Sequence, residues 1–275
     1  MRFAKYPFML FVLCGLVLLP TQAQESAVPR IAIVIDDLGN SRFQQRFAEL
    51  PGPLTLALLP HTPFAERMAT RAHETGKEVI IHMPMQAGSN LDAGTGMLST
   101  DDDKAEFIML MEQAFLQLPQ AVGMNNHMGS RLTALIEPMQ WVMEQLALRN
   151  FYFLDSRTTA ATQAEQVARQ FGLPVARRHI FLDNNPQPSE IASRWDDFIA
   201  HAHKHGEAIA IAHPHRTTYE FLQLTLPKLS EYGVELVFAS SLAEHSTQQP
   251  IQLTDHLAEP RAAENSTTDT KTPAH

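Results

Sequence analysis

Short runs of aliphatic residues, separated by helical stretches, recur along most of this chain and constrain its fold more than any other feature. Continuous apolar runs, rather than alternating ones, are typical of strands that are buried on both faces, as in parallel sheets. We therefore predict eight strands, at residues 31–35, 54–59, 79–81, 121–124, 151–154, 174–176, 208–212 and 234–239.

The segments between these runs have the marks of helices. Pro63 stands where a first helical residue would, Gly76 follows as a stop, and a helix from Ser189 would end at Gly206. Strand and helix in repeated alternation predict an α/β fold with a parallel sheet. With about eight strands and no Gly-rich dinucleotide turn, a distorted parallel (β/α) barrel of seven to eight strands is favoured over an open sheet. We assign it to residues 29–245 and predict no second domain.

The first 23 residues resemble a secretory signal peptide. Arg2 and Lys5 precede an apolar run at 8–19, which is short for a bilayer-spanning helix, and 21–23 (TQA) offer small residues at a cleavage position. We predict cleavage after Ala23 and a periplasmic or secreted protein, with an uncleaved membrane anchor as the alternative. No stable membrane span is then expected in the mature chain.

Composition indicates which parts of the chain fold and which kinds of partner it can bind. Hydrophobic residues make up 44% of the chain and charged residues 19%, which suits a folded core. The formal charge of −9 argues against nucleic acid as a partner, since phosphate binding needs clustered Lys and Arg. Residues 246–275 are rich in Thr, Glu, Pro and Ala and predict a disordered tail.

Polar residues follow several of the predicted strands, at the ends where active sites of parallel α/β folds lie. A carboxylate with two neutral imidazoles is a good ligand set for Zn²⁺ and related ions. We therefore predict one divalent metal ion, with zinc the expected one, near the Asp36-Asp37 pair; a turn that caps a helix before Gly39 is the alternative for that pair. The polar residues at the strand ends are Asp36, Asp37, His61, His82, Asn125, Asn126, His127, Arg131, Asp155, Ser156, Arg157, His213 and His215.

Six segments taken together resemble one known family. They are IAIVIDDLG, LALLPHTPF, GKEVIIHMPM, GMNNHMGSRLT, FLDSRTT and IAIAHPH, in order between Pro29 and Ser241. As a set they resemble the divergent polysaccharide deacetylase family, a branch of the carbohydrate esterases with a distorted parallel barrel. The resemblance implies a metal-dependent hydrolase that removes N-acetyl groups from an envelope polysaccharide or a peptidoglycan-type glycan. The alternative is a catalytically inactive envelope module that keeps the fold and binds glycan or protein.

The resemblance also implies metal ligands. In the wider superfamily an Asp-Asp pair after the first strand gives a base and then a ligand, which here correspond to Asp36 and Asp37. His82 matches the first histidine of a two-histidine motif, but Gln86 stands where the second would be, and His127 is the replacement ligand we predict. A core role for His82 and a loop-shaping role for His127 are the alternatives.

Further residues take roles at the same rim. His213 matches the general acid of the superfamily, with His215 the less favoured choice, and Asp155 would orient this acid. Arg131 pairs with Asp155 or binds a substrate oxygen. The predicted substrate-binding residues are Asn126, Arg131, His61 and His215. His179 and Asp183 have no assigned role, although Asp183 is equally placed to line the site.

Overall fold

The computed structural model describes residues 28–89 and 91–245. The predicted signal peptide and tail lie outside the described residues. The sheet has the order β6-β5-β4-β3-β2-β1-β8-β7, with every neighbouring pair parallel, so the predicted α/β class and distorted parallel barrel are confirmed. Its strands are β1 (Arg30–Leu38), β2 (Thr55–Leu58), β3 (Glu78–Met85), β4 (Gly123–Met128), β5 (Tyr152–Asp155), β6 (Val175–Arg177), β7 (Ile180–Phe181), β8 (Glu207–Ala212) and β9 (Glu235–Leu236).

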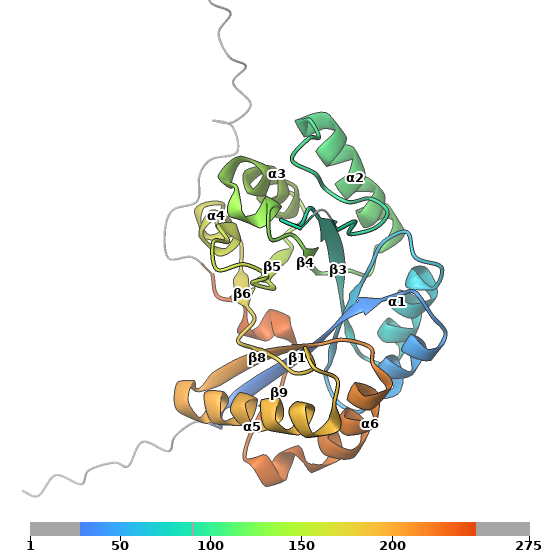
Figure 1. The fold of residues 1–275 in the computed structure, drawn as a ribbon, viewed down its shortest axis with the longest axis vertical. Helices are drawn as coiled ribbons and strands as arrows, with labels where there is room; N and C mark the ends of the chain where they lie inside the picture. The colour runs from blue at the N-terminus through green and yellow to red at the C-terminus, as the bar shows by residue number, and fades with distance from the viewer. Residues whose placement is uncertain (1–27, 90, 246–275) are drawn as a thin grey trace, which may run out of the picture.

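Six α-helices within residues 28–89 and 91–245 surround the curled sheet. Figure 1 shows them around its outer face in chain order, from α1 to α6. In the part of the chain that the structure describes, no helix is long and apolar enough to cross a membrane. The α-helices are α1 (Ala65–Glu74), α2 (Lys104–Gln117), α3 (Ile136–Ala147), α4 (Ala164–Gln170), α5 (Pro188–His205) and α6 (Arg216–Thr225). Short 3₁₀ helices span Phe43–Glu49, Leu132–Ala134, Leu226–Tyr232 and Ala239–Leu242.

The two faces of the sheet pack into two different apolar layers. On β1, Ile31, Ile33 and Ile35 belong to the large core under the helices, whereas Ala32 and Val34 belong to a smaller cluster that fills the inside of the curl. All five side chains are fully buried. Alternate residues of a strand point to opposite faces, so a residue two positions beyond Val34 also points inward.

The curl stays open between β6 and β7, which do not pair. Only Arg178 and His179 separate these strands, and their backbone N–H groups donate to opposite sides of the gap. Arg178 donates to the carbonyl of Asp155 on β5 at 3.0 Å, and His179 donates to that of Ile209 on β8 at 2.9 Å. A single crossing of the chain therefore bridges the opening. The sequence analysis did not predict β7, because its two residues are too few to form a recognisable apolar run.

The predicted strand at 234–239 is wrong for most of its length. Only β9 pairs, beside the first residues of β1, and the chain then turns into the 3₁₀ helix Ala239–Leu242. Ala239 and Leu242 pack into the inner cluster. The apolar residues after β9 therefore close the end of the curl at which the strands begin, instead of extending the sheet.

A buried hydrogen-bonded group fixes this closure. Glu78 Oε1 accepts from the hydroxyls of Thr55 and Tyr152, both at 2.8 Å, and from the backbone N–H of Ser240 at 3.3 Å. Thr55 Oγ1 in turn accepts from the N–H of Ala239 at 3.0 Å. Burial is the main factor that raises the pKa of Tyr152 well above its ordinary value, so the phenol remains a donor at every pH of interest.

We expect Tyr152→Phe to lower the free energy of unfolding by about 1–2 kcal/mol, because it removes a buried hydrogen bond to a carboxylate. Urea denaturation of both proteins measures this. Tyr232→Phe is the matched control, since no hydrogen bond of the Tyr232 hydroxyl occurs within the described ranges, and it should change the stability by less than about 0.5 kcal/mol. Equal effects of the two variants would contradict the role given to Glu78.

Candidate metal centre and active site

An irregularity at the end of β1 brings two consecutive carboxylates to the same place. The pairing of β1 with β2 shifts its register between Ile35 and Leu38, and Asp37 has a φ of 58°. In a regular strand Asp36 and Asp37 would point to opposite faces. Here Asp36 Oδ2 lies 3.6 Å and Asp37 Oδ1 3.1 Å from the same atom, His82 Nε2. The bulge therefore aims both carboxylates at one point, as bulges beside active sites commonly do.

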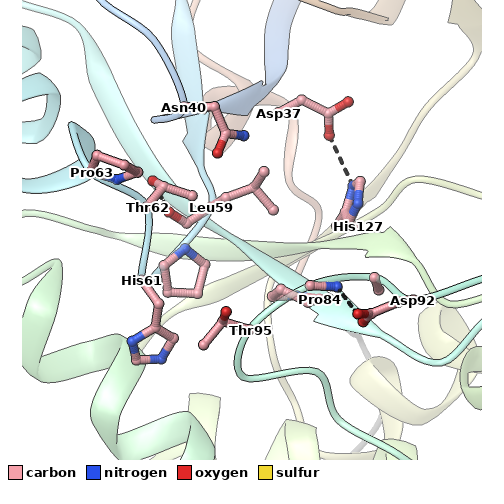
Figure 2. A pocket seen from close by; sticks show the side chains of 13 residues that line it. Asp37, Asn40, Leu59, His61, Thr62, Pro63, Pro84, Asp92, Thr95 and His127 are labelled. Atoms are coloured by element: carbon pink, nitrogen blue, oxygen red, sulfur yellow. Dashed lines mark hydrogen bonds and ion pairs between the residues drawn. The ribbon is translucent and has the colours of Figure 1, made fainter.

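Three donor atoms converge at this point. Asp37 Oδ1 lies 2.9 Å from His127 Nδ1 and 3.1 Å from His82 Nε2, and the two imidazole nitrogens are 3.1 Å apart. Figure 2 shows the Asp37–His127 contact at the edge of a hollow. Within the described residues, these three side chains form the group of His, Cys, Asp and Glu suited to a metal. The structure thus brings together the three ligands predicted from the sequence.

Asn125 of β4 fixes the orientation of His82. Its amide Nδ2 donates to Asp36 Oδ1 at 2.8 Å, so its Oδ1 is left to accept from His82 Nδ1 at 2.7 Å. The proton on Nδ1 makes Nε2 the nitrogen that is free to bind a cation, an arrangement typical of metal-binding histidines. Because Asn125 is fully buried, this orientation is held firmly.

The converging atoms require positive charge among them. A lone pair of His82 Nε2 that faces a carboxylate oxygen at 3.1 Å is repelled unless a proton or a metal ion lies between them. Burial opposes charge on both Asp37 and His82. Hydrogen bonds from His127 and His82 nevertheless lower the pKa of Asp37 well below its ordinary value. The carboxylates of Asp36 and Asp37 raise the pKa of His82 above its ordinary value. The site therefore favours a carboxylate next to a cation.

The geometry suits a divalent ion as well as protons. Donor atoms bound to one ion at about 2.1 Å lie roughly 3.0–3.4 Å apart, close to the three distances found here. One carboxylate with two imidazoles is also a ligand set that zinc and similar ions prefer. Asp37, His82 and His127 thus fit the predicted metal.

Asp36 differs from its neighbour in its surroundings. It is 2% exposed, and burial, the largest influence on it, raises its pKa. Both a hydrogen bond from Asn125 and the nearby His82 and His213 work against this shift. A carboxylate of raised pKa beside a metal site is suited to accept a proton.

His213, after β8, lies on another side of the same mouth and is held by Asp183. Its Nδ1 lies 2.8 Å from Asp183 Oδ1, and its backbone N–H donates to Asp183 Oδ2 at 2.7 Å. The Thr218 hydroxyl also donates to Asp183 Oδ2 at 2.7 Å. Burial lowers the pKa of His213, but the Asp183 carboxylate outweighs burial and raises it to about 9. His213 is therefore a protonated imidazole at neutral pH.

The predicted role of Asp155 is wrong, because Asp155 does not contact His213. Tyr152 and Leu154 of β5 pack in the inner cluster and Phe153 packs under the helices, so the pleat turns Asp155 outward with Phe153. Its carboxylate accepts from the Arg157 N–H at 2.8 Å and from the Thr162 hydroxyl at 3.0 Å. It stabilises the turn after β5 and is not part of the site.

One predicted substrate-binding residue is also corrected. Asn126, next to the inward-facing Asn125, points outward; it is 1% exposed, its Nδ2 donates to the Met128 carbonyl at 2.7 Å and its Oδ1 accepts from the Ser156 N–H at 3.0 Å. Neither atom is available to a substrate. Arg131 is exposed at the start of the 3₁₀ helix Leu132–Ala134, and no ion pair with Asp155 occurs in the described chain, so a contact with a substrate oxygen stays the prediction for this residue.

Gln86 forms hydrogen bonds within the protein and does not belong to the metal group. Its Oε1 accepts from the N–H of Thr100 at 3.0 Å and from the Thr100 hydroxyl at 2.6 Å, and its own N–H donates to the Leu98 carbonyl at 2.9 Å. It thus joins the two ends of the loop after β3, while His127 from the neighbouring strand supplies the third donor atom of the group.

Two hollows flank the metal group, and Asp37 and Asn40 line both of them. The first, of about 390 Å³, contains His127 and His61. The second, of about 500 Å³, contains His213 and His215. The remaining substrate-binding predictions, His61 and His215, therefore lie in hollows next to the site.

The sequence analysis named Asn125 and Asp183 but gave no role to either, although both carry the geometry of the site. Counting alternate positions inward from the apolar residues would have found both. Asn125 is two residues before His127, and Asp183 is two residues after Phe181, whose ring packs against the inner cluster.

Comparisons with known proteins agree with this architecture. The chain is 38% identical over 214 residues to the uncharacterised protein YibQ of Escherichia coli K12, and the matched region covers 78% of this chain and 67% of YibQ. It is 35% identical over 217 residues to an uncharacterised protein of Haemophilus influenzae, with 78% and 77% covered. Its fold matches the crystal structure of an uncharacterised protein of Agrobacterium tumefaciens C58 with a TM-score of 0.75 at 23% identity, over 78% of this chain and 89% of that one.

A family model described as divergent polysaccharide deacetylase matches residues 33–243, which include the metal group, its Asn125 support and the His213–Asp183 pair. The chain therefore belongs to the divergent polysaccharide deacetylase family.

Proposed function

We propose that this protein is a metal-dependent hydrolase that removes N-acetyl groups from an envelope polysaccharide or related glycan, after export by its N-terminal segment. The observation that carries the proposal is the arrangement of Asp36 and His213 beside one three-donor metal group. A buried carboxylate with a raised pKa and a protonated imidazole are the base and acid that amide hydrolysis needs.

Each side chain has a distinct part in this proposal. Asp37, His82 and His127 would hold the metal, for which zinc is the proposed ion; when bound, it supplies Lewis-acid activation of water and of the acyl carbonyl. Asp36 takes the proton that the attacking water loses as the C–O bond forms. His213 gives the proton from its Nε2 to the amine nitrogen as the C–N bond breaks, and Asp183 keeps His213 oriented for this transfer.

We expect the purified protein to bind about one Zn²⁺ per chain. Asp37→Ala should weaken binding by more than about 100-fold because it removes the charged ligand, and Asn125→Ala by roughly 10- to 100-fold because it frees the His82 ring to turn. Isothermal titration calorimetry measures both. Asp92→Ala removes an exposed carboxylate from the first hollow and is the matched control. Equal zinc affinity in wild type and Asp37→Ala would place the metal elsewhere.

We expect Asp36→Asn and Asp37→Asn to differ although the residues are adjacent. Asp36→Asn keeps an oxygen that can accept from Asn125 but no longer takes a proton, so it should keep its metal and lose on the order of 10²–10⁴ in rate. Asp37→Asn should lose the metal as well. Acetate release from N-acetylated oligosaccharides and zinc content measure the two effects. A wild type that binds zinc and glycan but releases no acetate would instead identify a binding module.

We expect the rate to fall as pH rises through the pKa of His213, since only the protonated ring donates. With Asp183 in place this occurs near pH 9. Asp183→Asn removes the charge that raises the pKa, so the alkaline limb of kcat/KM should move to lower pH by roughly one to three pH units. An NMR titration of the His213 ring gives the same pKa independently of turnover. An unchanged ring pKa would refute the pairing of His213 with Asp183.

A further inference from the structure

The two hollows beside the metal group differ in what they offer the reaction. The second contains His213, the proposed proton donor to the leaving amine, together with Asn184 and His215. In the first, Asp37 and His127 lie at one end, and the His61 imidazole lies with Thr95 at the other end, away from the metal group, as Figure 2 shows.

The position of His213 decides which half of the amide lies in which hollow. A general acid must come within hydrogen-bonding distance of the atom that it protonates, so the amine nitrogen and its substituent lie on the His213 side. The carbonyl carbon carries its other substituent on the side away from that nitrogen. The acyl group is therefore directed into the first hollow, past His127.

The first hollow is much larger than an acetyl group requires. A methyl group is about the size of a water molecule, which takes roughly 30 Å³ in the liquid. The hollow has about 390 Å³, within the range of about 300–1,000 Å³ that is typical of small-molecule sites. An acetyl group would leave most of this space to water.

The lining indicates what kind of acyl group fits. The Thr95 hydroxyl and the His61 imidazole offer hydrogen bonds, and the flat faces of Pro60 and Pro63 offer apolar contact. The carboxylate of Asp92 stands in the same wall and disfavours an anion. Gly96 packs closely against the His61 ring, since a Cβ atom at this position would lie 2.8 Å from the ring.

We propose that the first hollow binds the acyl half of the scissile amide and that the enzyme accepts uncharged, hydrogen-bonding acyl groups larger than acetyl. This inference rests on the proposed amide hydrolysis. The reaction is R–CO–NH–R′ + H₂O → R–COOH + H₂N–R′, in which R, the larger polar group, occupies the hollow that His61 and Thr95 line.

Hydroxamates test this without turnover, because they bind a metal through their two oxygens and carry R in place of the acyl substituent. We expect zinc-loaded protein to bind N-acetylglycine hydroxamate at least about tenfold more tightly than acetohydroxamate. The anionic succinate monohydroxamate should show no such gain. Competition against a fluorescent hydroxamate, or calorimetry, measures the three affinities.

Two filling variants locate the group R. Thr95→Phe occupies the first hollow and should reduce the tenfold ratio to about one, whereas Asn184→Phe, on an equally exposed residue of the second hollow, should leave the ratio unchanged. A ratio that only Asn184→Phe abolishes, or no gain for the longer hydroxamate in wild type, would overturn the inference while metal binding and acetate release still stood. Failure to bind zinc or acetohydroxamate would instead overturn the proposed hydrolysis.

Discussion

The curled sheet has helices on its outer face and its own side chains inside, so each strand must divide its residues between two buried layers. At the closed end the inner layer is apolar, with Ala32 and Val34 from β1. At the mouth the same inward positions carry Asp36, His82 and Asn125, and the narrow curl brings them within 3.6 Å of one another. The site is thus the polar continuation of the inner core, and its geometry depends on the pleat of each strand.

Crowding of these groups gives two adjacent aspartates opposite properties. The side chain of Asp37 is 34% exposed and accepts from two imidazoles, whereas that of Asp36 is 3% exposed and accepts from a neutral amide. The first is held as an anion that needs a cation beside it, and burial shifts the second toward its protonated form. The bulge that aims both at His82 therefore gives the proposed ligand and the proposed base different surroundings without any difference in residue type.

The sequence predicted the α/β class and the parallel barrel, because apolar runs mark buried strands, and it placed Asp37, His82 and His127 at one rim, because the ends of parallel strands meet there; their roles as ligands came from the family resemblance. The sequence-based prediction failed where it depended on which face of the sheet a side chain points to. Asp155 ends a strand as Asp36 does, but it stands on the outward side of the pleat, and Asn126 differs in the same way from Asn125. The apolar residues at 234–239 could not reveal that the chain turns beneath the curl, since a 3₁₀ plug and a strand bury similar side chains.

The loop after β3, which Gln86 joins at its two ends, connects the metal group with the first hollow. In the parallel ladder Pro84 of β3 pairs with His127 of β4, so the strand next to β3 brings the His127 imidazole within 3.1 Å of His82 Nε2. The loop after β3 supplies none of the three donor atoms. Gln86 joins the two ends of this loop through hydrogen bonds with Thr100 and Leu98. The segment that this tie holds carries Asp92 and Thr95, which form the far wall of the first hollow. All three donors thus come from β1, β3 and β4, and the loop after β3 shapes the space beside them.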